Sequence, residues 1–204
     1  MENNFDIIRP LLKWRSEDDF YYVQILQRKK DHKAGMKVNG TNNNARLVKS
    51  YQVKSLEHLD FIEPEIIQLC KVFNARAGIN LNRRSFEANH LKLLKKIVQQ
   101  MENKDYNKAH KAYDSVVGAN MQENEKKWIL DIDPEDVAEG WNGPIMSDFL
   151  DTLQPVDGKN KTLAIIPSKS GLHVITRPFN LMEFKKEYPN IDVQKNNPTN
   201  LYIP

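Results

Sequence analysis

The segment Trp128-Ile-Leu-Asp-Ile-Asp133 decides the fold of the second half of this chain, because apolar residues alternate with carboxylates along it. On a β-strand, alternate side chains lie on the same face. Leu130 and Ile132 are therefore predicted to pack into a core, while Asp131 and Asp133 project together from the opposite face. The segment predicts a strand that ends in two carboxylates aimed at one place.

The residues after this strand alternate between helix and strand patterns. A β-α-β-β-α-β order follows from them, which is the ferredoxin-like or RNA-recognition-motif (RRM) order. The predicted segments are a helix at 145–153, strands at 162–166 and 172–177, a helix at 180–187 and a strand at 190–193.

The residues before it also predict alternating strands and helices. The strands are expected at 20–27, 47–53 and 75–82, and the helices at 55–72 and 86–101. We therefore expect an α+β fold in one compact two-lobed unit. An amino-terminal α/β module, residues 1–110, would pack on an RRM-like palm, residues 127–204, with the polar residues 102–126 as the link.

The composition sets limits on the class of protein. A chain of 204 residues can form one substantial domain or two small lobes that share a core. The single cysteine, Cys70, excludes a disulfide framework and a zinc site built from cysteines. The net charge of +3 is compatible with nucleic-acid contact. We expect a cytoplasmic protein without a membrane partner, because the sequence has neither an apolar run of membrane-spanning length nor a signal-peptide pattern.

A third carboxylate, Asp192 in Ile191-Asp-Val193, is a candidate to join Asp131 and Asp133. Hard divalent cations prefer oxygen ligands and keep positions open for substrate phosphates. Two such cations can clamp both the attacking and the leaving oxygen of an in-line displacement. The three carboxylates therefore predict a two-metal site for Mg²⁺ or Mn²⁺. A calcium-binding loop starting at Asp131 is excluded, because its sixth and twelfth positions would hold Asp and Asn instead of Gly and Glu.

The segment Ser168-Lys-Ser-Gly-Leu-His173 predicts an anion site. A tight turn before a strand can bring backbone N–H groups, hydroxyls and an ammonium group together around a polyphosphate. Lys169 and Ser170 are the predicted phosphate contacts beside His173. Lys195 is a further candidate to neutralise a phosphate, and is equally well explained as a solvated surface lysine.

Two adjacent arginines, Arg83 and Arg84, lie between a predicted strand and a predicted helix. Cationic side chains and backbone N–H groups at such a junction suit phosphate binding. Solvated surface arginines are the alternative. The pair is the candidate nucleic-acid contact of the first module.

Taken in order, these motifs resemble those of the archaeo-eukaryotic primase superfamily, which includes primase-polymerases and the polymerase domains of bacterial end-joining ligases. The superfamily has the motifs hydrophobic-Asp-hydrophobic-Asp, small-x-His and hydrophobic-Asp. They are matched here by Leu130 to Asp133, by Gly171-Leu-His173 and by Ile191-Asp192. The resemblance covers residues 127 to 204.

The resemblance implies a nucleotidyltransferase that adds nucleotides on a single-stranded template. Asp131, Asp133 and Asp192 would hold the two metal ions, and His173 would bind the phosphates of the incoming nucleotide. The implied partners are nucleoside triphosphates, single-stranded DNA or RNA, and a separate helicase or replication protein.

Two other functions compete with this interpretation. A catalytically silent relative would bind single-stranded nucleic acid through the same fold. A rolling-circle nuclease would need two histidines flanking a hydrophobic residue, and here Gly171 takes the place of the partner of His173.

Overall fold

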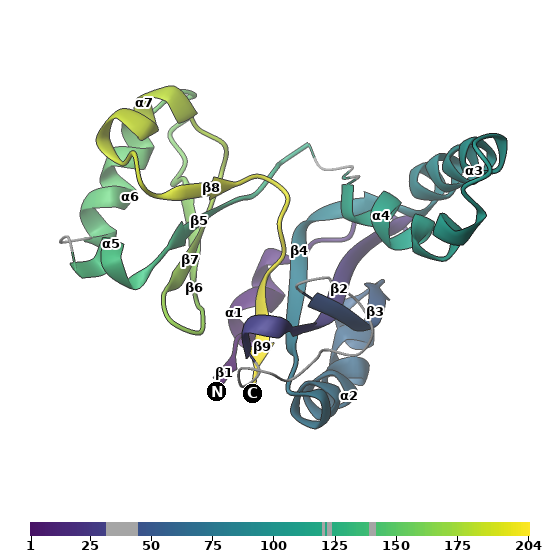
Figure 1. Ribbon diagram of the computed structural model, residues 1–204. Helices are drawn as coiled ribbons and strands as arrows, with labels where there is room; N and C mark the ends of the chain where they lie inside the picture. Colours follow the sequence, from purple (N-terminus) through teal and green to yellow (C-terminus); the bar gives the residue numbers. More distant parts are fainter. Residues whose placement is uncertain (32–44, 120, 122–123, 139–141) are drawn as a thin grey trace.

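The computed structural model of the protein describes residues 1–31, 45–119, 121, 124–138 and 142–204 (Figure 1). It is an α+β structure with two antiparallel sheets. The first sheet has the order β1 (Glu2–Asn3), β9 (Thr199–Ile203), β4 (Arg76–Ser85), β2 (Asp19–Arg28) and β3 (Ala45–Val53). The second has the order β6 (Thr162–Pro167), β7 (Leu172–Thr176), β5 (Trp128–Ile132) and β8 (Asp192–Gln194).

The helices begin and end at residues whose side chains or backbone suit these positions. Ser55 and Ser85 each accept a hydrogen bond from the backbone N–H three residues on, as N-cap residues do. The α-helices of the first half are α1 (Phe5–Ile8), α2 (Leu56–Phe73), α3 (Phe86–Glu102) and α4 (Ala112–Ala119), and those of the second half are α5 (Pro134–Ala138), α6 (Gly143–Thr152) and α7 (Leu181–Glu187). Short 3-10 helices are η1 (Arg9–Leu11), η2 (Lys29–Asp31) and η3 (Tyr106–Lys111).

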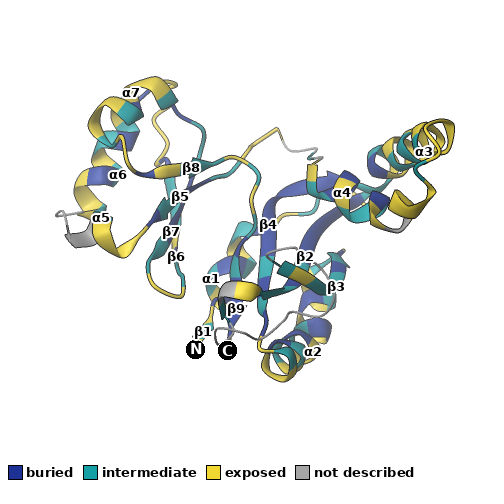
Figure 2. Ribbon diagram, viewed as in Figure 1, coloured by how far each residue is buried: buried dark blue, intermediate teal, exposed yellow. Residues whose placement is uncertain are grey.

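The first half of strand β2 is buried on both faces, which explains the apolar run Phe20-Tyr-Tyr-Val23. Tyr21, Val23 and Ile25 belong to the core cluster that also contains the buried side chains of α2. Phe20 and Tyr22 point to the other face, where they pack with residues of α4. Figure 2 shows this buried centre and the exposed outer sides of the helices.

The second sheet is also covered on both faces. Leu130 and Ile132 pack with the buried residues of α6 and α7. On the other face, Ile129, Ile166 and Ile175 belong to the same core cluster as the residues of the first sheet. One continuous apolar core therefore joins the two sheets, and polar residues at the end of β5 come to lie beside the first sheet.

The last strand departs from the expected division at residue 127. After β8 the chain crosses from the second sheet to the first, where β9 pairs with β1 on one side and with β4 on the other. Leu201, Tyr202 and Ile203 are all buried, so this strand needs an interior position in a sheet. The expected link at 102–126 likewise contains η3 and α4, and Val117 of α4 is fully buried.

Helix α3 projects from the body of the molecule beside α4 (Figure 1). It leaves Leu91, Leu94 and Val98 exposed. Among the helices in the described part of the chain, none combines the length and apolar character needed to cross a bilayer.

Candidate functional site

Strand register places the predicted site residues in one row across the second sheet. His173 of β7 pairs with Asp131 of β5, and Asp131 pairs in turn with Asp192 of β8. Directly paired residues of antiparallel strands project to the same face. This face is the one whose isoleucines join the core of the first sheet. The row therefore lies at the junction of the two sheets.

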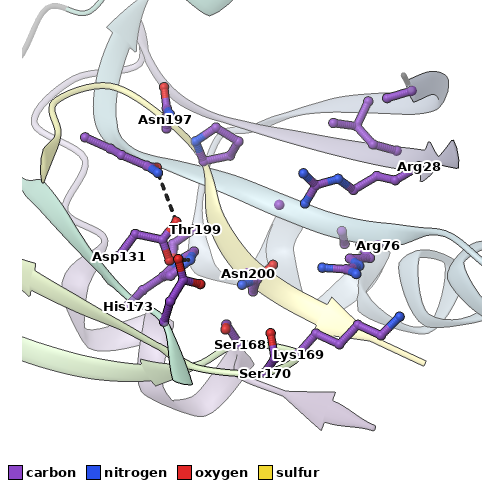
Figure 3. A pocket seen from close by; sticks show the side chains of 17 residues that line it. Arg28, Arg76, Asp131, Ser168, Lys169, Ser170, His173, Asn197, Thr199 and Asn200 are labelled. Atoms are coloured by element: carbon purple, nitrogen blue, oxygen red, sulfur yellow. Dashed lines mark hydrogen bonds and ion pairs between the residues drawn. The ribbon is translucent and has the colours of Figure 1, made fainter. Parts of the chain in front are cut away.

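His173 is held at both ring nitrogens. Its Nε2 lies 3.3 Å from Oδ1 of Asp131, and its Nδ1 lies 2.9 Å from the hydroxyl of Thr199 (Figure 3). The residue is only 8% exposed. Because Thr199 belongs to β9, the imidazole connects a carboxylate of the second sheet to a strand of the first.

The carboxylates of Asp131 and Asp192 share one hydrogen-bond donor. Nε2 of Gln194 donates to Oδ2 of Asp131 at 3.1 Å and to Oδ2 of Asp192 at 2.9 Å. Asp133 lies just beyond the end of β5, and its backbone N–H donates to the carboxylate of Asp136. Asp133 and Asp131 line one pocket, and Asp192 is bridged to that pocket through Gln194.

This pocket has a volume of about 380 Å³ and takes its walls from both sheets (Figure 3). The second sheet contributes the acidic wall and the turn before β7, while the first sheet contributes Arg28 and Arg76. The segment that leads into β9 closes the remaining side. Other residues that line the pocket include Ser168, Lys169, Ser170, Asn197, Pro198 and Asn200.

The turn before β7 is shaped by internal hydrogen bonds. The Ser168 N–H donates to the Gly171 carbonyl at 2.9 Å, and the Gly171 N–H donates to the Ser168 hydroxyl at 3.0 Å. A Cβ atom at Gly171 would lie 2.0 Å from the carbonyl oxygen of Ile132. The glycine is needed for this close approach, whereas Lys169 and Ser170 remain at the pocket surface.

Lys169 makes an ion pair within the protein. Its Nζ lies 3.0 Å from Oδ1 of Asp31, and the guanidinium group of Arg76 contacts the same oxygen. Burial by itself raises the pKa of the Asp31 carboxyl. The hydrogen bonds and charges of Arg76 and Lys169 outweigh burial, so this pKa lies below its ordinary value. The pocket therefore contains cationic groups opposite its carboxylates, and two of these cations, Lys169 and Arg76, are already paired.

Three predicted contacts lie outside the pocket. Nζ of Lys195 lies 4.8 Å from the ring centroid of Trp128, whose own packing is with the cluster of α6 and α7. Arg83 is 4% exposed and donates to Asp19 at 2.6 Å. Arg84 is fully buried and donates to the carbonyls of Asn82 and Val117.

The two arginines are buried because β4 continues through them as an interior strand. Burial lowers the pKa of Arg84 to about 10. Neither arginine has the exposed surface that a phosphate contact requires. This placement argues against the expected nucleic-acid contact at Arg83 and Arg84, and indicates that they stabilise the fold.

Among its described residues, the site contains carboxylates but no assembled metal site. In the described part of the chain, no group of three or more His, Cys, Asp or Glu side chains is arranged to hold a metal. Asp131 and Asp192 nevertheless present two carboxylate oxygens around the amide group of Gln194. Carboxylate oxygens are the kind of ligand that Mg²⁺ prefers, and both of these oxygens accept hydrogen bonds from Gln194 in this structure.

Two residues of the pocket, Arg76 and Thr199, come from strands of the first sheet and lie in none of the three matched motifs. Arg28, from another strand of that sheet, begins the basic stretch Arg28 to Lys33, for which a solvated surface is the ordinary interpretation. Gln194 lies one residue beyond the predicted strand 190–193; because β8 extends to it, it lies two residues after Asp192 on the same face.

The comparisons with known proteins give no match: no family model fits the chain, and neither a curated protein nor a solved structure is similar to it.

Proposed function

We propose that this protein is a metal-dependent nucleotidyltransferase of the primase-polymerase type, which adds nucleotides on a single-stranded DNA or RNA template. The observation that carries the proposal is the row of Asp192, Asp131 and His173 in register across three neighbouring strands. Asp131 and His173 of this row line a pocket to which Arg28 and Arg76 contribute from the first sheet. Carboxylates opposite cations suit a nucleoside triphosphate with its metal ion.

The fold of the second half supports the proposal. The strand order β6-β7-β5-β8, with antiparallel neighbours and the helices α6 and α7 on one face, agrees with a ferredoxin-like palm. Many unrelated proteins share this order. The argument for the primase superfamily therefore rests on the positions of Asp131, His173 and Asp192 within the fold.

In this function Asp131, Asp192 and the nearby Asp133 would hold Mg²⁺ or Mn²⁺. The bound cation would supply Lewis-acid stabilisation of the phosphate and of the attacking hydroxyl. Without a cation, close carboxylates repel one another. The Gln194 amide offsets part of this repulsion by donating to two of them.

The other pocket residues would bind and orient the substrate. His173 is fixed by Thr199 and Asp131 through both of its ring nitrogens, so it positions the carboxylate, and binding of a phosphate oxygen would require one of these partners to be exchanged. Lys169 and Ser170 project from the turn beside it. Fixed charges of this kind lower the barrier mainly by positioning and electrostatic stabilisation, and pyrophosphate would leave.

Incorporation of labelled nucleotides on single-stranded templates, with Mg²⁺ or Mn²⁺, tests this proposal. Asp131→Asn and Asp192→Asn should each reduce incorporation by about 100-fold or more, since each removes a charge with little change in shape. Asp148→Asn, an exposed carboxylate on α6, is the matched control and should retain activity. A wild-type protein that incorporates no nucleotide on any template would reject the proposal.

One observation favours a second candidate function. Both oxygens of the Asp131 carboxylate already contact protein groups, His173 and Gln194. A module that only binds single strands would need no metal at this position. Its affinity would depend on salt through lysines and arginines, and Asp131→Asn would leave that affinity unchanged or slightly increased.

A further inference from the structure

Two cationic side chains of the pocket are already paired with a carboxylate of the same chain. Asp31, the last residue of η2, accepts hydrogen bonds from Arg76 and from Lys169 at the same carboxylate oxygen. Both cations line the pocket, whereas Asp31 is absent from that lining and borders a small cavity of about 30 Å³ behind them. The side chain of Lys169 consequently extends away from Asp131 and His173 (Figure 3).

The two ion pairs of Asp31 differ in burial. The side chains of Asp31 and Arg76 are 7% and 12% exposed, while that of Lys169 is 54% exposed. A half-exposed ion pair contributes at most about 1 kcal/mol. A buried carboxylate, by contrast, must keep a partner, because an unpaired buried charge is strongly destabilising. Lys169 can therefore leave Asp31 at small cost while Arg76 keeps the carboxylate neutralised.

Only one of the two carboxylate oxygens of Asp31 accepts hydrogen bonds from the described residues. Its second oxygen, Oδ2, is buried without a hydrogen-bond partner among the residues that the structure describes. Lys169 thus shares a single carboxylate oxygen with Arg76. A phosphate group offers several oxygens and more negative charge, and hydrogen bonds to it are correspondingly strong.

We propose that Asp31 is a built-in competitor that holds the ammonium group of Lys169 away from Asp131 and His173 until a polyphosphate, the triphosphate of the nucleotide in the proposed function, displaces it. Lys169 then exchanges the Asp31 carboxylate for phosphate oxygens, and Asp31 stays paired with Arg76. Asp31 comes from η2, which follows β2 of the first sheet, and Lys169 comes from the turn before β7 of the second sheet. The exchange therefore also releases one ionic contact between segments that adjoin different sheets.

The test is the affinity for inorganic triphosphate, measured by calorimetry without template or divalent metal. Asp31→Asn should increase this affinity by up to about fivefold, which corresponds to the loss of an ion pair worth at most about 1 kcal/mol. Asp148→Asn changes the net charge equally at an exposed site on α6 and should have no effect. An unchanged or reduced affinity in Asp31→Asn, or no binding in either protein, overturns the proposal.

A double-mutant cycle separates competition for Lys169 from the general effect of removing a negative charge. In a Lys169→Met background, Asp31→Asn should increase the affinity by less than it does in the wild-type background, because only the release of Arg76 remains. An equal gain in both backgrounds overturns the proposal. If Asp31→Asn alone fails to fold, the same comparison is made between Arg76→Gln and the double variant Asp31→Asn, Arg76→Gln, where the buried pair is removed as a unit.

This inference rests on the proposed function only for the identity of the ligand. Wild-type protein that binds triphosphate but never incorporates a nucleotide would reject nucleotidyl transfer. The double-mutant cycle would still decide whether Asp31 competes with the anion for Lys169. Conversely, equal affinities in wild type and Asp31→Asn would reject the competition even in an active enzyme.

Discussion

His173 and Asp131 are direct cross-strand partners, with Nε2 of the imidazole 3.3 Å from Oδ1 of the carboxylate. The other ring nitrogen contacts the hydroxyl of Thr199, in a strand of the other sheet. The position of the central carboxylate therefore depends on a contact between the two sheets. A substitution in the first sheet should therefore change the position of the Asp131 carboxylate through this imidazole.

Thr199→Val tests this connection. Valine keeps the shape of threonine but lacks the hydroxyl, so Nδ1 of the buried His173 loses its partner. We expect the free energy of unfolding to fall by about 1–3 kcal/mol in urea denaturation. Thr176→Val is the control, since the buried Thr176 hydroxyl has no partner among the described residues. That variant should be neutral or stabilising, and equal losses in both would contradict the role of Thr199.

Gly171→Ala should destabilise the turn beside the site. The new Cβ would lie 2.0 Å from the Ile132 carbonyl oxygen, so either β5 or β7 must move. A cost of about 1–3 kcal/mol is typical for such overpacking, and thermal unfolding would measure it. Gly118→Ala is the matched control on α4, where a Cβ meets nothing within 4 Å. Alanine should be neutral or slightly stabilising there, because it favours helix more than glycine does.

The sequence predicted the parts of the fold that local patterns determine. The alternation of Leu130, Asp131 and Ile132 was sufficient to predict the strand and both of its faces, and the structure confirms them. The position of Asp192 on the same face as Asp131 was also predictable. It follows from strand order, which the β-α-β-β-α-β pattern anticipates.

The rest depends on contacts between distant residues. Arg76 reaches the site from β4 of the first sheet and is paired there with Asp31 of η2, and no local spacing encodes that pairing. β9 joins the first sheet because its buried residues need an interior position in a sheet, which no short motif reveals. Arg83 and Arg84 suggested a strand end because charged residues are seldom buried. Their partners, Asp19 and several backbone carbonyls, could be identified only from the fold.

Arg84→Lys should therefore reduce stability without changing nucleic-acid affinity. Lysine keeps the charge but lacks the planar fork that donates to several carbonyls. We expect a loss of about 2 kcal/mol or more in the free energy of unfolding, since bonds to charged groups are worth about 1.5–3 kcal/mol each. Arg46→Lys, at an exposed position of β3, should change stability by less than about 0.5 kcal/mol. A weaker, less salt-dependent affinity for single strands in folded Arg84→Lys would instead restore a binding role for this arginine.

The Asp31 ion pairs predict a pH-dependent contribution to stability. Burial raises the pKa of Asp31, but hydrogen bonds and charges of Arg76 and Lys169 lower it more, so the folded protein binds this proton less tightly than the unfolded chain. The stabilisation is therefore complete above the unfolded pKa and is lost as pH falls through the folded pKa. Wild type should be more stable than Asp31→Asn at pH 7, and the difference should shrink steadily in acid. Denaturation of both proteins across this range measures the difference directly, because other carboxylates titrate in both and cancel. A difference that stays constant from neutral to acid pH would show that Asp31 stabilises the fold by its shape and not by its charge.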